Sequence, residues 1–224
     1  MQNLKSMKSS PHGQRSRSLA TQTAIMQATE RLIAMHGAHN ISIKHIVHEA
    51  GQKNQSALQY HFKNLEGLIS SIHRTRGEQI HQKRSELLEV LESSRRPLKL
   101  RDLCGLMVFP TFLLAKSDSS FRQYVTAFSQ EITLADDSAL SKASKSGAGG
   151  ESGVRLGKLL RAALPHLDSK TYKARMDIAV RACSAAMGNR LRKREILQGP
   201  SADFFINNLI DSLEGLLNAP KSEI

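Results

Sequence analysis

The stretch ISIKHIVHEAGQKNQSALQYHFKNLEGL, residues 41–68, predicts two short helices joined by a tight turn. Its first part places apolar side chains at the i, i+3, i+4, i+7 spacing of one helix face: Ile43, Ile46, Val47 and Ala50. Ser42 can cap this helix, and Gly51 tolerates the left-handed conformation that ends one. A second helix is expected over residues 55–62, and such a pair forms a helix-turn-helix.

The outer face of the second predicted helix carries amides, hydroxyls and an imidazole, and no acidic group. These side chains are Gln55, Ser56, Gln59, Tyr60 and His61, followed by Lys63. Such groups pair with base edges and phosphate oxygens, whereas a carboxylate would be repelled by the phosphates. The pattern therefore indicates a DNA-binding surface. The alternative is an ordinary helical hairpin with a polar outer face.

The segment AGQKNQSALQYHFKNLEGL, residues 50–68, resembles the recognition region of the TetR family of bacterial transcriptional regulators. That family typically has Ala-Gly, a polar turn, a small-residue helix, Tyr-His-Phe or a close variant, and an acidic-x-Leu helix start. The matching residues are Ala50-Gly51, Ser56-Ala57-Leu58, Tyr60-His61-Phe62 and Glu66-Gly67-Leu68. The resemblance spans about residues 21–72. It departs from the family pattern at Leu65, where many members have a lysine.

This resemblance implies an all-α protein of about nine helices. A tri-helical helix-turn-helix DNA-binding domain would occupy residues 21–72, and an α-helical ligand-binding and dimerisation domain residues 73–224. The implied function is a ligand-responsive transcriptional repressor that binds pseudo-palindromic operator DNA as a homodimer. Two alternatives remain open: a DNA-binding regulator or activator without an effector, and a helical protein-interaction module or enzyme.

Ten residues are predicted to contact DNA. The resemblance assigns phosphate contacts to Ser42, Lys44 and Tyr60, with His61 and Lys63 beside them. Gln59 is the strongest candidate for direct base contact, because glutamine can form two hydrogen bonds with adenine. The complete set is Ser42, Lys44, Lys53, Asn54, Gln55, Ser56, Gln59, Tyr60, His61 and Lys63.

The composition agrees with a folded protein that has a polyanionic partner. The chain is 40% hydrophobic, its net charge is +12 and its pI is about 10.0. No stretch approaches the apolar length of a membrane span, and the N-terminus lacks the apolar core of a signal peptide. A cytoplasmic protein without membrane contact is therefore expected.

Two segments are predicted to be irregular. Residues 1–20 contain four Lys and Arg and no acid, so a disordered basic arm is expected. Such an arm can follow phosphates or enter a minor groove, and the alternative is a solvated tail. Residues 136–153 are rich in Ser, Gly, Ala and Lys and predict a flexible loop.

The second domain is predicted to hold an effector and to dimerise. Residues 98–115 form an apolar helix containing Pro110, and kinked apolar helices often border a cavity. An apolar or aromatic small molecule is expected there; the alternative is that the same side chains are simply core. The candidates are Met107, Phe109, Phe112, Tyr124, Phe128, Met176, Cys183 and Met187. The last two helices, residues 169–197 and 202–217, are predicted to pair across a twofold axis, with an intrachain core helix as the alternative.

No catalytic, metal or cofactor site is predicted. His45 and His48 are three residues apart on one helix, but no carboxylate or cysteine is placed to complete a metal site. None of the common catalytic or nucleotide-binding motifs is present. Cys104 and Cys183 lie in apolar helical patterns and are expected to be reduced and buried, with a redox-sensing pair as the alternative.

Overall fold

The computed structural model describes residues 11–145, 150–193, 195 and 197–221. In these ranges it contains ten α-helices, one 3-10 helix and no strand, which confirms the predicted all-α class. The chain divides into two compact units, Met1–Ile69 and Ser70–Ile224. The division therefore falls between residues 69 and 70, slightly before the predicted boundary between 72 and 73.

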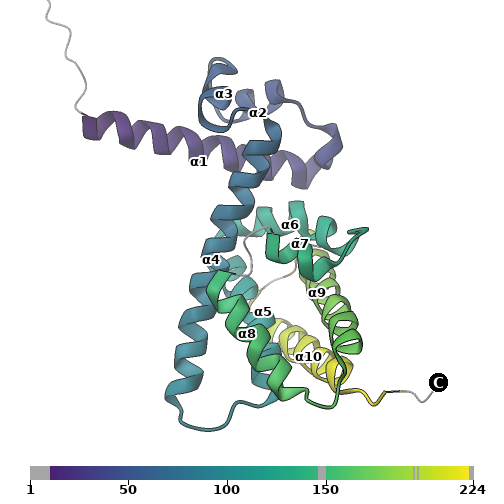
Figure 1. The fold of residues 1–224 in the computed structure, drawn as a ribbon. Helices are drawn as coiled ribbons and strands as arrows, with labels where there is room; N and C mark the ends of the chain where they lie inside the picture. The colour runs from purple at the N-terminus through teal and green to yellow at the C-terminus, as the bar shows by residue number, and fades with distance from the viewer. Residues whose placement is uncertain (1–10, 146–149, 194, 196, 222–224) are drawn as a thin grey trace, which may run out of the picture. The chain divides into compact units, whose positions relative to one another are not determined.

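The first unit is a small helical domain. It consists of α1 (Pro11–His36), η1 (Ala38–Asn40), α2 (Ile43–Glu49), α3 (Ser56–Phe62) and the first residues of α4 (Leu65–Ser93). The helices α2 and α3 both pack against α1, as Figure 1 shows. Their apolar stripes form one core of buried side chains: Ile25, Ala28, Leu32, Ile33, Ile46, Val47, Leu58, Phe62 and Leu68.

Side-chain caps define two of the helix starts in this unit. The Ser42 hydroxyl accepts a hydrogen bond from the backbone N–H of His45 at 3.3 Å and so caps α2. The Asn64 side chain accepts one from the backbone N–H of Gly67 at 2.8 Å and caps α4. A Cβ atom at Gly67 would lie 2.2 Å from the Phe62 carbonyl oxygen. The chain can therefore pass from α3 into α4 this closely only with glycine at position 67.

The prediction of a disordered arm over residues 1–20 is wrong for residues 11–20, which form the first part of α1. Pro11 suits a first helical turn, because its fixed φ is helical and its missing N–H is not needed there. Residues 14–20 contain neither glycine nor proline, so nothing in the local sequence interrupts the helix. Residues 1–10 of the predicted arm lie outside the described residues.

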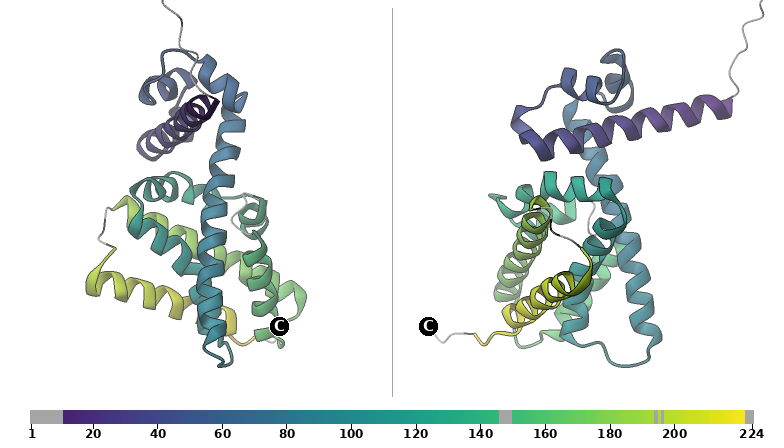
Figure 2. Two further views of the ribbon diagram at one scale, coloured as in Figure 1. Left: turned by 90° about the vertical axis from the view of Figure 1, so that its left-hand side faces the viewer. Right: turned by 180° about the vertical axis from the view of Figure 1, so that it is seen from behind.

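The second unit contains the rest of α4 and six further helices. These are α5 (Leu100–Ser117), α6 (Ser119–Thr133), α7 (Ala139–Lys145), α8 (Gly150–Ala163), α9 (Ser169–Arg192) and α10 (Gly199–Asn218). Helix α9 packs against α6, α7 and α10, and α5 packs against α6, α8 and α10. Figure 2 shows α9 and α10, in light green and yellow, side by side. Phe121, Leu103, Leu106 and Leu160 are among the fully buried side chains of this core.

The predicted flexible loop over residues 136–153 is largely helical. It contains α7 and the start of α8, while residues 146–149 lie outside the described residues. Asp177 of α9 holds α7 in place, because its carboxylate accepts hydrogen bonds from the Ser138 hydroxyl at 2.8 Å and the Leu140 N–H at 3.2 Å. Helix α7 is the one that raises the described total to ten, against the predicted nine or so.

Pro110 lies inside α5 and leaves the Leu106 carbonyl without its usual helical donor. The Nε atom of Arg84 in α4 donates to that carbonyl at 3.3 Å. Its Nη1 atom also donates to the Ser152 hydroxyl of α8 at 3.3 Å. Burial of the guanidinium lowers the pKa of Arg84 to about 10, so it stays charged at neutral pH. A single arginine thus joins α4, α5 and α8.

Candidate nucleic-acid interface

The connection between α2 and α3 is a tight turn closed by backbone hydrogen bonds. Gly51 has φ +66°, a conformation that suits glycine, and its N–H donates to the His48 carbonyl at 3.0 Å. The Gln52 N–H donates to the Val47 carbonyl at 2.9 Å. The Asn54 side chain accepts from the Ser56 N–H at 3.0 Å, at the start of α3. The Asn54 oxygen thus serves the turn itself.

Helix α3 presents one apolar and one polar face. Leu58 and Phe62 are buried in the core of the first unit, with 0% and 6% of their surface exposed. The opposite face includes Gln59 and Tyr60, and Tyr60 is 82% exposed. Nine of the ten predicted DNA-contact residues are exposed: Ser42, Lys44, Lys53, Asn54, Gln55, Ser56, Gln59, Tyr60 and Lys63.

His61 differs from the other nine because it is half-buried. Its Nδ1 atom lies 3.2 Å from Nε2 of Gln22 in α1, and its ring meets the Tyr60 ring edge-on at a centroid distance of 4.9 Å. His61 therefore joins α3 to α1. The sequence did not single out Gln22, because its partner is 39 residues away and no local pattern records that contact.

The end of α3 has an unusual backbone. Lys63 has φ +67° and ψ −52°, and the Asn64 N–H donates to the Phe62 carbonyl at 2.8 Å. These values describe a γ-turn of the rare, strained kind, centred on a residue that has a side chain. Strain of this kind is often found at binding sites. Here it sits where an exposed lysine follows the polar face of α3.

The first unit is electropositive. Residues 1–69 contain eight Lys and Arg and three Glu, a net charge of +5. Of the three carboxylates, Glu30 is buried and Glu49 is paired with Arg31 at 2.9 Å. The exposed polar face of α3 carries no carboxylate at all. The electrostatic field around α3 therefore favours a polyanion.

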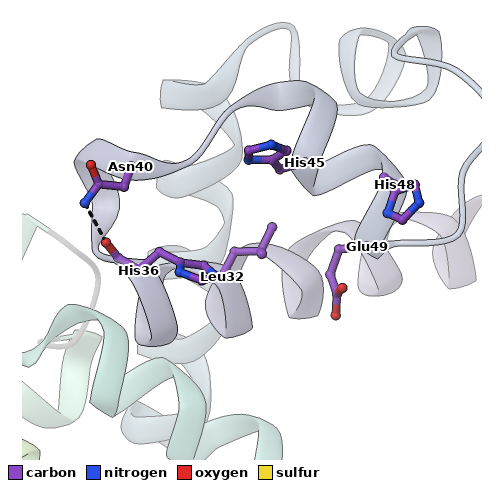
Figure 3. Close-up of a pocket in the computed structure, with 6 residues that line it drawn as sticks. All are labelled: Leu32, His36, Asn40, His45, His48 and Glu49. Atoms are coloured by element: carbon purple, nitrogen blue, oxygen red, sulfur yellow. Dashed lines mark hydrogen bonds between the residues drawn. The ribbon is translucent and has the colours of Figure 1, made fainter.

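A cavity of about 500 Å³ lies in the first unit, between the end of α1 and α2 (Figure 3). It is lined by Leu32, His36, Asn40, His45, His48 and Glu49. His45 and His48, the two histidines considered for metal binding, are both among its lining residues, as is His36. Among the described residues, however, no three His, Cys, Asp or Glu side chains are grouped so that they could hold a metal ion.

Comparison with known proteins identifies the fold. No family model matches the sequence, and no curated protein matches it. Among solved structures, the chain is similar to a TetR family transcription regulator from Marinobacter aquaeolei VT8, with 15% identity, a TM-score of 0.55 and coverage of 88% of this chain and 97% of that one. The fold is that of the TetR-family regulators. The fatty acid degradation regulator FadR from Bacillus halodurans is also similar, with 16% identity, a TM-score of 0.55 and coverage of 89% and 99%.

The TetR-type fold confirms the predicted architecture of a helix-turn-helix unit followed by a second helical unit. Both similar proteins match over nearly their whole length, so the likeness covers both units. Within the described ranges, none of the helices combines the length and the apolar character that a membrane crossing needs.

The residues predicted to line an effector pocket lie in the helical core of the second unit of this TetR-type fold. Phe112, Tyr124, Phe128, Met176 and Met187 are buried, and Met107, Phe109 and Cys183 are half-buried. A second cavity, of about 480 Å³, lies along α8 and is lined by Gly150, Glu151, Val154, Arg155 and Lys158. Neither this cavity nor the one beside α2 is lined by any of the eight predicted residues.

A polar group accompanies the aromatic residues of α6. His73 of α4 places Nδ1 3.4 Å from the Tyr124 hydroxyl and Nε2 3.5 Å from the Glu131 carboxylate. Its ring meets Phe128 edge-on at a centroid distance of 4.7 Å. Burial opposes ionisation of Glu131, but the hydrogen bond from His73 and the charges of His73 and Lys142 lower its pKa. The sequence did not identify His73, because its partners are more than 50 residues away.

Neither Cys104 nor Cys183 forms a disulfide bond. Burial raises the pKa of the Cys104 and Cys183 thiols to about 12. Each therefore remains a protonated thiol at neutral pH, and protonated thiols are poor nucleophiles. This protonation state agrees with the predicted role of the two residues as small apolar side chains.

Proposed function

We propose that this protein is a dimeric, ligand-responsive transcriptional repressor that binds pseudo-palindromic operator DNA through α3. It would act in the cytoplasm, where the chromosome is accessible. The observation that carries the proposal is the exposed polar face of α3, free of acidic residues and fixed by the buried Leu58 and Phe62. A short helix held this way in a helix-turn-helix can enter a major groove.

The contacts divide into two classes. Gln59, with Gln55 and Ser56, would form hydrogen bonds with base edges or the nearest backbone. Lysines and hydroxyls around α3 would bind phosphates and set the orientation of the domain. The phosphate-binding group comprises Ser42, Lys44, Lys53, Asn54, Tyr60 and Lys63, with His61 beside them.

A homodimer would form through α9 and α10. Each helix leaves a large apolar side chain in solvent, with Ile178 52% exposed and Phe204 73% exposed. Exposed apolar side chains on two adjacent helices favour a second copy, and twofold pairing is the commonest arrangement of such surfaces. Two α3 helices would then meet half-sites about one helical turn, roughly 34 Å, apart.

The effector would be an apolar or aromatic small molecule bound in the second unit near Phe112, Tyr124 and Phe128. It can control DNA binding only if it binds one arrangement of the dimer better than another. Helix α4 runs from the first unit into the second, and α5 contains Pro110, so these two helices are the proposed link. The similar FadR protein is a fatty acid degradation regulator, which is compatible with an apolar effector.

Selection of bound fragments from a pool of genomic duplexes tests the proposed function directly. We expect enrichment of one motif with twofold symmetry, in DNA to which the purified protein binds as a dimer. Failure to enrich any duplex at modest ionic strength would refute DNA recognition. Enrichment of an asymmetric motif by a monomer would refute the symmetric arrangement.

The alternative candidate is a DNA-binding regulator or activator without an effector. Most of the predicted pocket residues are buried in the core of the second unit. Their burial favours a regulator without an effector, because these side chains pack against one another. Thermal unfolding against a metabolite library distinguishes the two, because a true effector raises the melting temperature by mass action. Stabilisation by an apolar compound that also lowers DNA affinity supports the ligand-responsive form.

A further inference from the structure

The first part of α1 projects beyond the core of the first unit. Ile25 is the first buried residue among the described residues of α1. From Gln14 to Ala20 the side chains are exposed, apart from the half-buried Ser18, and Leu19 is 56% exposed. Figures 1 and 2 show this part of α1 extending past α2 and α3. We call residues 14–20 the α1 extension.

The charge of the α1 extension has one sign. It carries Arg15 and Arg17, and the first acidic residue of the chain is Glu30. A helix of this length has little stability of its own in water, and like charges add nothing to it. An exposed basic helix of this kind is complementary to a phosphate backbone.

A contact between α1 and α3 fixes which side of the extension faces α3. Gln22 of α1 lies 3.2 Å from His61 of α3, measured from Nε2 to Nδ1. Arg15 is seven residues before Gln22, so the two point in nearly the same direction, about 20° apart around the helix and about 10 Å apart along it. Arg17 is turned about 140° away from Gln22.

We propose that the α1 extension is a second DNA-contacting element and that Arg15 binds a backbone phosphate next to the groove occupied by α3. This inference rests on the proposed DNA-binding function. The phosphate backbone flanks every major groove. Arg15 lies about two turns of α1 before Gln22 and on the same side, so its cation continues the surface formed by α3. Arg17 has the same charge and exposure but faces elsewhere.

The experiment compares wild type, Arg15→Ala and Arg17→Ala on the enriched duplex over a salt series. For Arg15→Ala we expect weaker binding and a slope of log Kd against log salt that is shallower by about 0.9 per protomer bound. Arg17→Ala should keep the slope of the wild type, although both variants lose one positive charge. Arg15→Lys should restore the slope, because it keeps the cation on the same face.

The outcomes separate the role of Arg15 from DNA binding by α3. Equal slopes for Arg15→Ala and wild type, or equal losses for both alanine variants, would overturn the inference while leaving DNA binding by α3 intact. Failure of the wild type to bind any duplex would overturn both. Arg15 and Arg17 are both exposed, so neither alanine substitution should change the fold. Circular dichroism spectra and melting temperatures of the two variants check this.

Discussion

At the scale of single residues, Lys63 combines strain with a proposed contact. It occupies the centre of a strained γ-turn at the end of α3, with φ +67°. A glycine would adopt this conformation without steric cost. Lysine at position 63 therefore makes the folded protein less stable than glycine would. The proposed phosphate contact explains why a lysine is found there.

Replacing Lys63 with glycine should separate these two effects. We expect Lys63→Gly to raise the free energy of unfolding by about 1 kcal/mol, because relief of the backbone strain outweighs the added flexibility of the unfolded chain. The same variant should bind all duplexes more weakly and with a shallower salt dependence, because one phosphate contact per protomer is lost. Chemical denaturation and fluorescence anisotropy measure the two quantities. A variant that is more stable and binds as well as the wild type would remove Lys63 from the interface.

Gln59 should control sequence preference. Gln59 is exposed on α3 one turn before Lys63. We expect Gln59→Ala to reduce discrimination at one base pair of each half-site by about 1–3 kcal/mol and to leave the other positions unchanged. Binding to a set of single-base operator variants measures this. Equal losses on every variant would show that Gln59 contributes to affinity without contacting a specific base.

At the scale of helices, short elements depend on what they pack against. Helix α3 has seven residues, well below the length at which a helix is stable alone in water. Its stability comes from Leu58 and Phe62 in the core of the first unit. The sequence predicted this helix because the apolar spacing and the glycine turn are both local.

The two predictions of irregular structure failed over residues 11–20 and over α7 because their evidence was compositional. Residues 11–20 are polar yet continue α1, since a helix already nucleated by a buried core extends at little cost. Helix α7 is rich in Ser and Lys, but Asp177 holds its start from 37 to 39 residues away. Gln22, His73 and Arg84 were missed for the same reason, because their partners lie far along the chain.

Arg84 and Pro110 should be energetically coupled. Arg84 donates to the carbonyl that Pro110 leaves without a helical partner. We expect Arg84→Ala to destabilise the protein less in a Pro110→Ala background, by about 1 kcal/mol, because alanine supplies an N–H for the Leu106 carbonyl. Denaturation of the two single variants and the double variant measures this coupling. Additive losses would show that Arg84 acts independently of that carbonyl.

At the scale of the whole molecule, the proposed recognition of a symmetric operator requires two copies of the chain acting together. The two units are linked by one continuous helix, α4, and the proposed dimer surface lies on α9 and α10. DNA affinity should therefore depend on residues far from α3 in the sequence. No pattern in residues 41–68 could predict this dependence of DNA affinity on α9 and α10, because both helices lie in the second unit.

Phe204 tests this dependence. Phe204 is 73% exposed on α10, and we expect Phe204→Glu to weaken dimerisation by about 2 kcal/mol or more. Operator affinity should fall with it, while the circular dichroism spectrum of the folded monomer is retained. Val90→Glu on α4 is a matched control, because Val90 is 67% exposed outside the proposed interface. Sedimentation velocity measures the dimer. Equal effects of both variants would argue against a dimer through α9 and α10.

Major-groove recognition by α3 is tested most directly with the enriched duplex in which each purine is replaced in turn by its 7-deaza analogue. This change removes an acceptor atom that lies only in the major groove. If two α3 helices occupy successive major grooves, affinity will fall at two clusters of positions related by twofold symmetry and about one helical turn apart. Affinity that is unchanged at every position would contradict major-groove recognition by α3.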